Sequence, residues 1–330
     1  MDQAFLMPLP KSCGARRVFE IEPCYHSQSS ASSARINRLE KNKSLWPSLV
    51  CELRETPHSV EWLSQFAETD KGQSLLHLAV LDDQLECISL LAKDRCLLER
   101  RNQFGLTPLE LALYLHKPKS YDALTGSLMN RDFLSQPRVE IQKERPIDVE
   151  YLSQPVFESQ GALEEVLSYT QRAKTDEIIS HDRIWMGVYF DKEIQWGLHP
   201  RIAVQRVNEE IGYGVFASER ILSCAFLGEY TGLIVERKRK HARESKYCVR
   251  YTCWPLGKRA YVIDAEKMGN FTRFINHSDQ PNAGLVCVYW RGLPRLIFVS
   301  LKEIAEGSQI TFDYGRIFWK QSPDLSKRGL

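Results

Sequence analysis

Residues 269–278 read GNFTRFINHS, and the run ITFDYG follows at residues 310–315. Two shorter glycine-bearing runs precede them, GYGVFA at residues 212–217 and LGEYTG at residues 227–232. A Gly-x-Gly turn in a β-rich chain is by itself more often an ordinary turn than a binding site. The combination and order of the four runs are therefore more informative than any one of them.

The four runs lie in a part of the chain that is rich in short apolar and β-branched segments. From Trp185 onward these segments alternate with Gly, Pro and Asn, and they include residues 202–204, 215–216, 261–263, 285–289 and 296–299. This pattern is typical of short strands joined by loops that carry function. We expect a β-rich domain over residues 181–330.

A repeat precedes this domain. Gly72, His77 and Ala79 recur 33 residues later as Gly105, Glu110 and Ala112. The segments QSLLHLA at 73–79 and LTPLELA at 106–112 resemble the ankyrin signature, and the resemblance covers roughly residues 68–118. Two repeats are fewer than the three or so that a stack needs, so we expect flanking helices to cap them. The alternative is a plain helical hairpin in which the 33-residue recurrence arises by chance.

The rest of the chain divides by composition. Residues 1–38 are serine-dense with few large apolar side chains, which predicts a disordered arm. Apolar residues at three- and four-residue steps predict a helical, ankyrin-like domain over 39–130. Residues 131–180 form a proline-bearing connector that ends in an amphipathic helix. The expected fold class is α+β, a short helical repeat domain followed by a β-rich domain.

Composition excludes several classes of protein. Lys and Arg number 44 against 42 Asp and Glu, a net charge of +2, which argues against a protein that coats nucleic acid. No apolar run is long enough to cross a membrane, and the amino terminus lacks the apolar core of a Sec-type signal peptide. Nine cysteines without a CxxC pair indicate reduced thiols in a cytoplasmic or nuclear compartment.

Taken together, the four runs resemble the SET-domain protein-lysine methyltransferases from Arg201 to Trp319. This resemblance implies S-adenosyl-L-methionine as the methyl donor. It also implies small curved sheets whose carboxyl-terminal segment threads under an earlier loop, a pseudoknot of the kind that few folds contain.

The resemblance further implies roles for individual residues. Tyr314 is expected to align the lysine amine through its hydroxyl, with Tyr247, Phe312 and Phe318 as walls of the lysine channel. The residues expected to hold the donor are Gly212, Tyr213, Gly214, Tyr230, Arg273, Phe274, Asn276, His277 and Trp319. An ordinary strand aromatic is the alternative for Tyr247, and a satisfied core histidine is the alternative for His277.

Elementary chemistry agrees with this assignment. Methyl transfer to an amine is an in-line displacement, so the site must align nitrogen, methyl and sulfur and exclude water. The lysine must first lose a proton, and an apolar channel beside a cation lowers its pKa from about 10.4. The channel is therefore expected to be aromatic.

No metal is expected. Many histone-directed members carry a cysteine after Asn-His-Ser and a carboxyl-terminal zinc cluster, whereas Asp279 follows Ser278 here and no cysteine lies beyond Cys287. We expect the carboxyl-terminal segment to close the site without zinc, and the activity to survive chelators. Phe312 lacks the hydroxyl of a tyrosine, which predicts di- or trimethyl-lysine as the product.

The sequence therefore predicts a protein-lysine methyltransferase that acts on proteins with a target lysine, histones among them, while the repeats recruit a partner protein. A chain that starts near Gln160 is expected to keep activity on a peptide.

No membrane and no sequence-specific nucleic acid is expected as a partner. The basic run at 237–243 is either a solvated helix face or a localisation patch. The alternative function is a catalytically weak SET and ankyrin scaffold. The missing zinc residues favour a bacterial effector that enters a host cell without a Sec-type signal.

Overall fold

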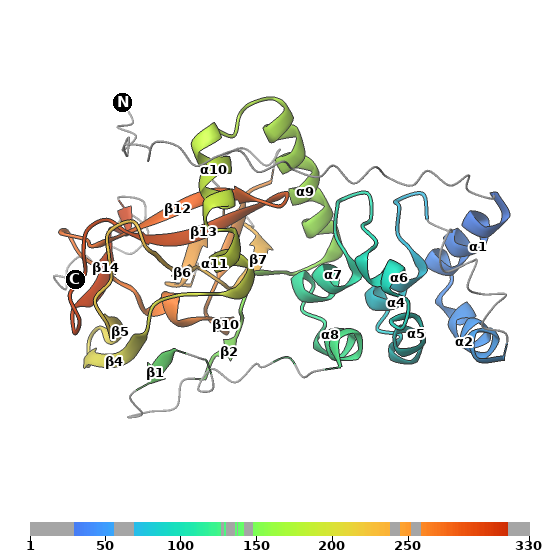
Figure 1. Cartoon of the computed structure of the whole chain (residues 1–330), viewed down its shortest axis with the longest axis horizontal. Coiled ribbons are helices and arrows are strands. Elements are labelled where there is room, and N and C mark those ends of the chain that lie inside the picture. The colour runs from blue at the N-terminus through green and yellow to red at the C-terminus, as the bar shows by residue number, and fades with distance from the viewer. Residues whose placement is uncertain are drawn as a thin grey trace.

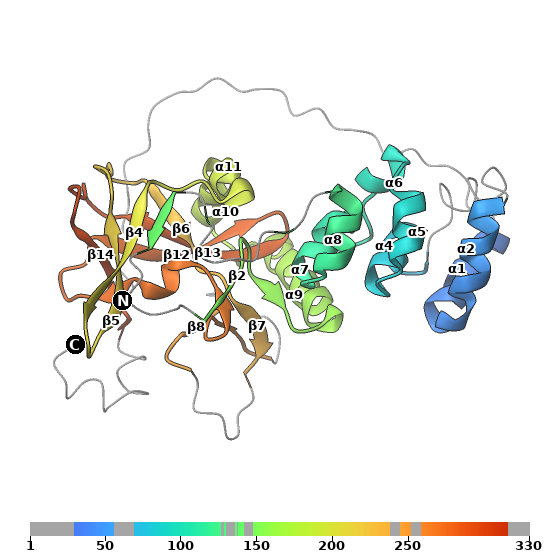
Figure 2. The ribbon, with the colours of Figure 1, turned by 90° about the horizontal axis from the view of Figure 1, so that it is seen from below.

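The computed structural model describes residues 30–55, 69–126, 129, 136, 138–141, 148–237, 245–251 and 259–315. Helices occupy one end of the molecule and small sheets the other, as Figures 1 and 2 show from two directions. None of the helices in these described ranges is long and apolar enough to span a membrane.

The helical part consists of short helices that lie side by side (Figure 1). They are α1 (Ser30–Lys41), the 3₁₀ turn η1 (Lys43–Leu45), α2 (Trp46–Glu55), α4 (Leu75–Leu81), α5 (Leu85–Leu91), α6 (Arg95–Glu99), α7 (Pro108–Tyr114) and α8 (Pro118–Thr125). Trp46, Leu76, Ile88 and Leu111 are among the buried residues of their common core. Amphipathic spacing therefore produces helices here, as expected.

The two repeated segments begin with equivalent caps. The Ser74 hydroxyl accepts a hydrogen bond from the backbone N–H of His77, and Thr107 accepts one from Glu110. These bonds satisfy N–H groups that the first turn of a helix leaves without partners. The helix pairs α4–α5 and α7–α8 pack against each other in the same order, α4 on α7 and α5 on α8.

The turns before the two repeats also touch. Gly72 has a φ of +66°, and a Cβ at this position would lie 2.9 Å from the backbone nitrogen of Gln103. His77 Nε2 lies 2.9 Å from the carbonyl oxygen of Leu106, and Asn102 donates to the Gln73 side chain. Glycine thus permits a close approach that polar side chains from both segments then fix.

The expected disordered arm is wrong for residues 30–38, because α1 already begins at Ser30. Ile36 and Leu39 are buried, and the Asn37 side chain exchanges hydrogen bonds with Asp70. Tertiary contacts here stabilise a helix that composition alone does not predict. Residues 1–29 lie outside the described ranges.

The described residues of the strand-rich part form four small sheets. One sheet has the order β1 (Val139–Ile141), β4 (Ile202–Asn208), β5 (Gly212–Ala217), β14 (Gln309–Phe312), β11 (Asn276–His277). A second has the order β12 (Ala283–Trp290), β13 (Leu293–Ser300), β6 (Phe226–Glu229), and a third the order β3 (Val156–Phe157), β7 (Leu233–Glu236), β9 (Tyr261–Asp264), β8 (Cys248–Arg250). The fourth pairs β10 (Met268–Gly269) with β2 (Glu150–Tyr151), and the 3₁₀ turn η3 (Phe271–Phe274) follows β10.

The segment predicted as a connector belongs to these sheets. β1, β2 and β3 pair in parallel with β4, β10 and β7 before the chain enters α9 (Gln160–Thr175). Runs of two or three strand residues are too short for alternation to reveal them. The predicted helix is present, but the preceding residues are sheet edges rather than a plain linker.

The expectation of strands from Trp185 onward is wrong at its start. Residues 181–196 form α10 (His181–Tyr189) and α11 (Asp191–Trp196), and Phe190 and Ile194 pack on the sheet of β6, β12 and β13. A Cβ on Gly187 would collide with the carbonyl oxygen of Tyr289, so α10 lies directly on β12. A short apolar run is compatible with either a helix or a strand, which explains the error.

The two parts share a buried junction. Tyr114, the last residue of α7, is 3% exposed. It lies near the fully buried Arg295 of β13, whose guanidinium forms a two-pronged ion pair with Glu229 of β6. Burial opposes the charge of Arg295, but Glu229 beside it outweighs burial and raises the pKa of the guanidinium. Helix α7, the first helix of the second repeat, therefore packs on the strand-rich part rather than facing solvent.

Candidate active site

The parallel pairing of β11 with β14 brings together two runs that are distant in sequence. Asn276 lies opposite Thr311, and His277 lies opposite Phe312. On its other edge β14 pairs with β5, which carries the Gly-Tyr-Gly run. Three of the four runs therefore meet in one sheet. The sequence predicts that these runs act together.

Tyr314 follows β14 and is held at both ends. Its hydroxyl donates a hydrogen bond to the carbonyl oxygen of Ile275 at 3.1 Å, and its backbone N–H donates to His277 Nδ1 at 3.2 Å. Burial, and to a lesser degree the neighbouring Tyr247, raise the pKa of the Tyr314 hydroxyl well above its usual value. This hydroxyl is therefore a fixed, protonated group.

Aromatic rings surround this hydroxyl. The Phe312 ring centroid lies 4.8 Å from that of Tyr314 and 4.9 Å from that of Phe298. The Tyr230 hydroxyl donates to the carbonyl oxygen of Tyr247 at 2.6 Å, and burial, then the nearby Tyr314, raise its pKa well above the usual value. The site wall is therefore apolar and contains hydroxyls that stay protonated.

Arg273 is the charged group of this wall. Its side chain lies over the Tyr247 ring at 3.8 Å from the centroid and near the Phe274 ring at 4.9 Å. Nη2 donates to the carbonyl oxygen of Glu266, whereas Nε is buried and has no hydrogen-bond partner among the described residues. A buried N–H of a cation without an acceptor is costly, so this atom suits a bound anion.

The Gly-Tyr-Gly run lies beside Arg273 and Asn276. The Asn276 side chain donates to the carbonyl oxygen of Tyr213 at 3.0 Å, and the Tyr213 ring lies 5.6 Å from that of Phe274. A Cβ on Gly214 would lie 2.6 Å from Gln309 Nε2 and 3.1 Å from Asn276 Nδ2, whereas the space at Gly212, with φ at +84°, is open. Gly214 thus permits the packing of β5, and Gly212 leaves its backbone accessible.

The loop after β11 positions Tyr314 and β14. His277 Nε2 lies 3.2 Å from Asp279 Oδ1, on the side of the ring opposite the nitrogen that meets Tyr314. Asn282 donates to the carbonyl oxygen of Gln309 and accepts from the N–H of Thr311. Asn282 lies four residues beyond the GNFTRFINHS run, and only the structure reveals that it anchors β14.

The structure thus gathers most of the predicted site residues around one point. The residues with direct contacts there are Tyr213, Gly214, Tyr230, Tyr247, Arg273, Phe274, Asn276, His277, Phe312 and Tyr314, with Gly212 at the open end of β5. Phe318 and Trp319 lie outside the described residues, as does the segment after Gly315 that the expected pseudoknot needs. Within the described ranges, no group of three or more His, Cys, Asp or Glu side chains is placed to hold a metal ion.

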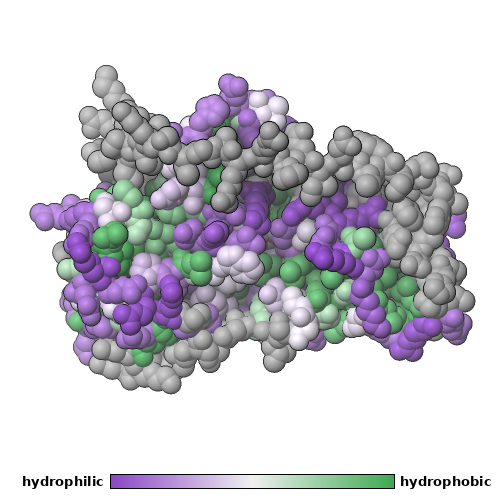
Figure 3. Space-filling view, viewed as in Figure 1, coloured by the Kyte–Doolittle hydropathy of each residue, from purple (hydrophilic) through white to green (hydrophobic). Residues whose placement is uncertain are grey.

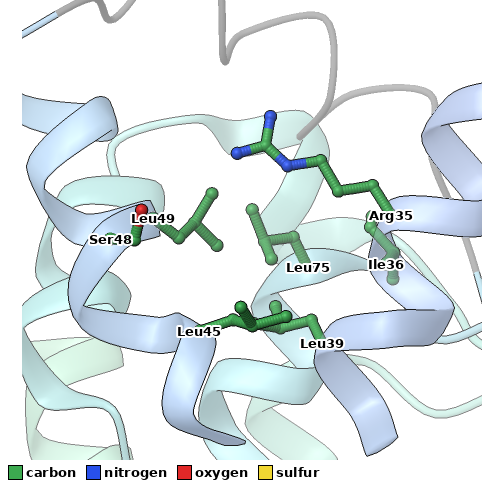
Figure 4. Close-up of a pocket in the computed structure, with 7 residues that line it drawn as sticks. All are labelled: Arg35, Ile36, Leu39, Leu45, Ser48, Leu49 and Leu75. Carbon is green, nitrogen blue, oxygen red and sulfur yellow. The ribbon is translucent and has the colours of Figure 1, made fainter. Parts of the chain in front are cut away.

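A separate hollow lies in the helical part. Its apolar lining comes from α1, α2 and α4 and includes Ile36, Leu39 and Leu75 (Figure 4). Figure 1 places these helices at the opposite end of the molecule from β14. Hydrophobic residues reach the surface over both parts of the molecule in Figure 3, so the candidate site is identified by its chemistry and not by hydrophobicity.

Comparison with known proteins agrees with this location. Residues 212–315 match the SET domain family. Histone-lysine N-methyltransferase SUV39H1 of Xenopus laevis is 29% identical over 132 residues, which are 38% of this chain and 31% of that protein. Human histone-lysine N-methyltransferase EHMT1 is 32% identical over 133 residues, 39% of this chain and 10% of its own length.

A third relative, human histone-lysine N-methyltransferase SETD2, is 34% identical over 112 residues, which cover 33% of this chain and 4% of that protein. The chain therefore spans less than a third of the length of each of these relatives. A solved structure of KRYPTONITE with mCHH DNA, an H3(1-15) peptide and SAH is 30% identical, covering 36% of this chain and 24% of that chain at a TM-score of 0.31. The carboxyl-terminal part of the present chain contains a SET domain.

Proposed function

We propose that this chain transfers methyl groups from S-adenosyl-L-methionine to lysine side chains of proteins, with histones as the substrate class. The observation that carries the proposal is the fixation of Tyr314 between Ile275 and His277 inside an aromatic wall. The relatives that match this segment are histone-lysine N-methyltransferases, which supports the choice of substrate class.

The residues present fit the donor. The unpaired Nε of buried Arg273 suits the donor's carboxylate, and the rings of Tyr213 and Phe274 suit a neighbouring sulfonium cation. The space beside Gly212 is open, and Asn276 holds Tyr213 of β5 through its backbone carbonyl. When bound, the donor supplies an electrophilic methyl group on sulfur.

The protein's own residues orient the amine and favour its neutral form, whose proton is lost to water. Because the Tyr314 hydroxyl gives its hydrogen to Ile275, the lone pairs of its oxygen can accept a hydrogen bond from the lysine nitrogen. That bond directs the nitrogen lone pair toward the methyl group and fixes the reacting geometry. The apolar rings around it disfavour the ammonium form, so the lysine enters as a neutral nucleophile.

Two finer statements belong to the same proposal. Phe312 offers no hydroxyl beside the amine, which supports a di- or trimethyl-lysine product. The stacked segments of α4–α5 and α7–α8 support an ankyrin-like recruiting surface for a partner or target protein in the cytoplasm or nucleus.

The test is methyl transfer by the purified full chain. We expect labelled methyl groups from S-adenosyl-L-methionine to appear on lysines of recombinant histones, identified by mass spectrometry. Tyr314→Phe should keep donor affinity in calorimetry but lose about a hundredfold or more in turnover, the typical effect of one preorganised hydrogen-bonding group. Donor binding without transfer to histones or lysate proteins would favour the scaffold function, and absence of donor binding would refute the proposal.

A further inference from the structure

The ring of His277 must hold its proton on one particular nitrogen. A backbone N–H can only donate, so the 3.2 Å hydrogen bond from Tyr314 requires an unprotonated Nδ1. In the neutral ring the proton is then on Nε2. This nitrogen lies 3.2 Å from Asp279 Oδ1, which can accept that proton's hydrogen bond.

Two carboxylates face this ring and favour opposite tautomers. Asp279, in the loop after β11, lies at Nε2, and Asp313, after β14, lies 3.8 Å from Nδ1. Asp313 Oδ1 already accepts a hydrogen bond from the N–H of Gly315 at 2.8 Å. Its separation from His277 Nδ1 is too long for a hydrogen bond. Asp279 is therefore the carboxylate whose contact agrees with the bond to Tyr314.

We propose that Asp279 is a positioning residue for methyl transfer, which fixes Tyr314 by holding His277 in the tautomer whose unprotonated Nδ1 accepts the Tyr314 N–H. This inference rests on the proposed function, because it concerns the residue that aligns the lysine amine. Asp279 is also the position at which the sequence lacks the cysteine of many histone-directed relatives. The carboxylate of Asp279 can accept a hydrogen bond from the His277 ring at this position.

The expected size of the effect follows from exposure. The Asp279 side chain is 99% exposed, whereas that of His277 is 10% exposed. A net intramolecular hydrogen bond contributes about 0.5–1.5 kcal/mol, and the lower part of this range applies to an acceptor as exposed as Asp279, which corresponds to a change of roughly two- to fivefold. Loss of the carboxylate should therefore reduce turnover by a few-fold.

Substitutions at position 279 distinguish an effect of the His277 tautomer from an effect of losing the side chain. The amide oxygen of Asp279→Asn still accepts from Nε2, so this conservative variant should retain most of the turnover. Asp279→Ala should lose about two- to fivefold in kcat. Asp279→Lys can only donate to Nε2, which moves the proton to Nδ1 against the Tyr314 N–H, and this variant should lose the most.

The experiment combines kinetics with ring-nitrogen NMR of the full chain. The expected order of kcat is wild type, Asn, Ala, Lys, with peptide KM and donor affinity nearly constant. Asp176→Lys, an exposed site at the end of α9, makes the same charge change and should leave kcat unchanged.

The outcomes separate this inference from the proposed function. A proton on Nδ1 in the wild-type ring, or an Asp279→Lys variant with wild-type kcat, would overturn the role of Asp279. If the wild type transferred no methyl groups, the proposed function would fail. The NMR signals would then still show whether Asp279 sets the tautomer.

Discussion

Phe312 lies between the rings of Tyr314 and Phe298 and is only partly buried. A tyrosine in its place would add a hydroxyl that seeks a water or the substrate amine as partner, since a buried hydroxyl without a hydrogen bond is unfavourable. We expect Phe312→Tyr to shift the product from di- or trimethyl-lysine toward monomethyl-lysine. Mass spectrometry of a peptide at long reaction times measures this shift. A wild type that stops at monomethyl-lysine would show that other walls, such as Tyr247, set the limit.

At the scale of residues, the sequence predicts the types of group better than their contacts. Tyr314, Asn276 and Arg273 lie at the site, as the motifs indicate. The hydrogen bond from Tyr314 to the His277 ring depends on the register of β11 with β14, which no local pattern contains. Donor contact by His277 stays a prediction, and the structure adds that its ring nitrogens face Tyr314 and Asp279.

At the scale of elements, strands of four or more apolar residues are predictable, whereas β1, β2 and β3 are not. Each of these strands takes its stability from a partner far along the chain and has too few residues for a period. The two helices α10 and α11 are missed for a different reason, because a short apolar run such as that of α10 fits either a helix or a strand.

The missed strands change the expected result of truncation. A chain that starts at Gln160 lacks β1, β2 and β3, including the buried Val156 and Phe157. We now expect this chain to be unstable and to lose donor binding, contrary to the expectation from sequence. A chain that starts at Arg138 retains the three strands and should bind the donor. Thermal unfolding and calorimetry compare the two, and equal stability would show that the strands are dispensable.

His77 makes the stability of the repeat helices depend on pH. It is fully buried between Ser74 and Leu106, and burial lowers its pKa to about 4. Since an unfolded histidine titrates near 6.5, the unfolded chain binds the proton first as the pH falls, and the folded state loses stability between about pH 6.5 and 4. The loss should reach roughly 3 kcal/mol at the lower limit.

Urea unfolding of the wild type and His77→Gln at several pH values tests this dependence. The variant should be less stable at pH 7 but should show a flatter decline on acidification. His181→Gln removes an exposed histidine and should keep the wild-type slope. Equal slopes in all three proteins would exclude His77 as the source.

At the scale of the whole molecule, Tyr114 joins the repeat helices to the sheets. Truncation of a large buried aromatic side chain to alanine costs about 3–5 kcal/mol. We expect Tyr114→Ala to lower the unfolding temperature of both parts together, because Tyr114 is buried at the end of α7, which contacts β3 of the strand-rich part. Far-ultraviolet circular dichroism and the fluorescence of buried Trp290 measure the two parts. Tyr114→Phe, which keeps the ring, is the control. A shift seen only in the helical signal would show two independent units.

The junction at Tyr114 also limits how the molecule can be redesigned. Recruiting domains are often exchanged between enzymes as cassettes joined by a flexible tether. Here Tyr114, at the end of α7, is buried near Arg295 and Glu229, and the residue after Glu229 is Tyr230, whose hydroxyl donates to the carbonyl oxygen of Tyr247. We expect a graft that replaces α7 to disturb this buried junction. Retargeting should therefore alter only the solvent-facing turns of the earlier repeat and leave the final helix pair in place.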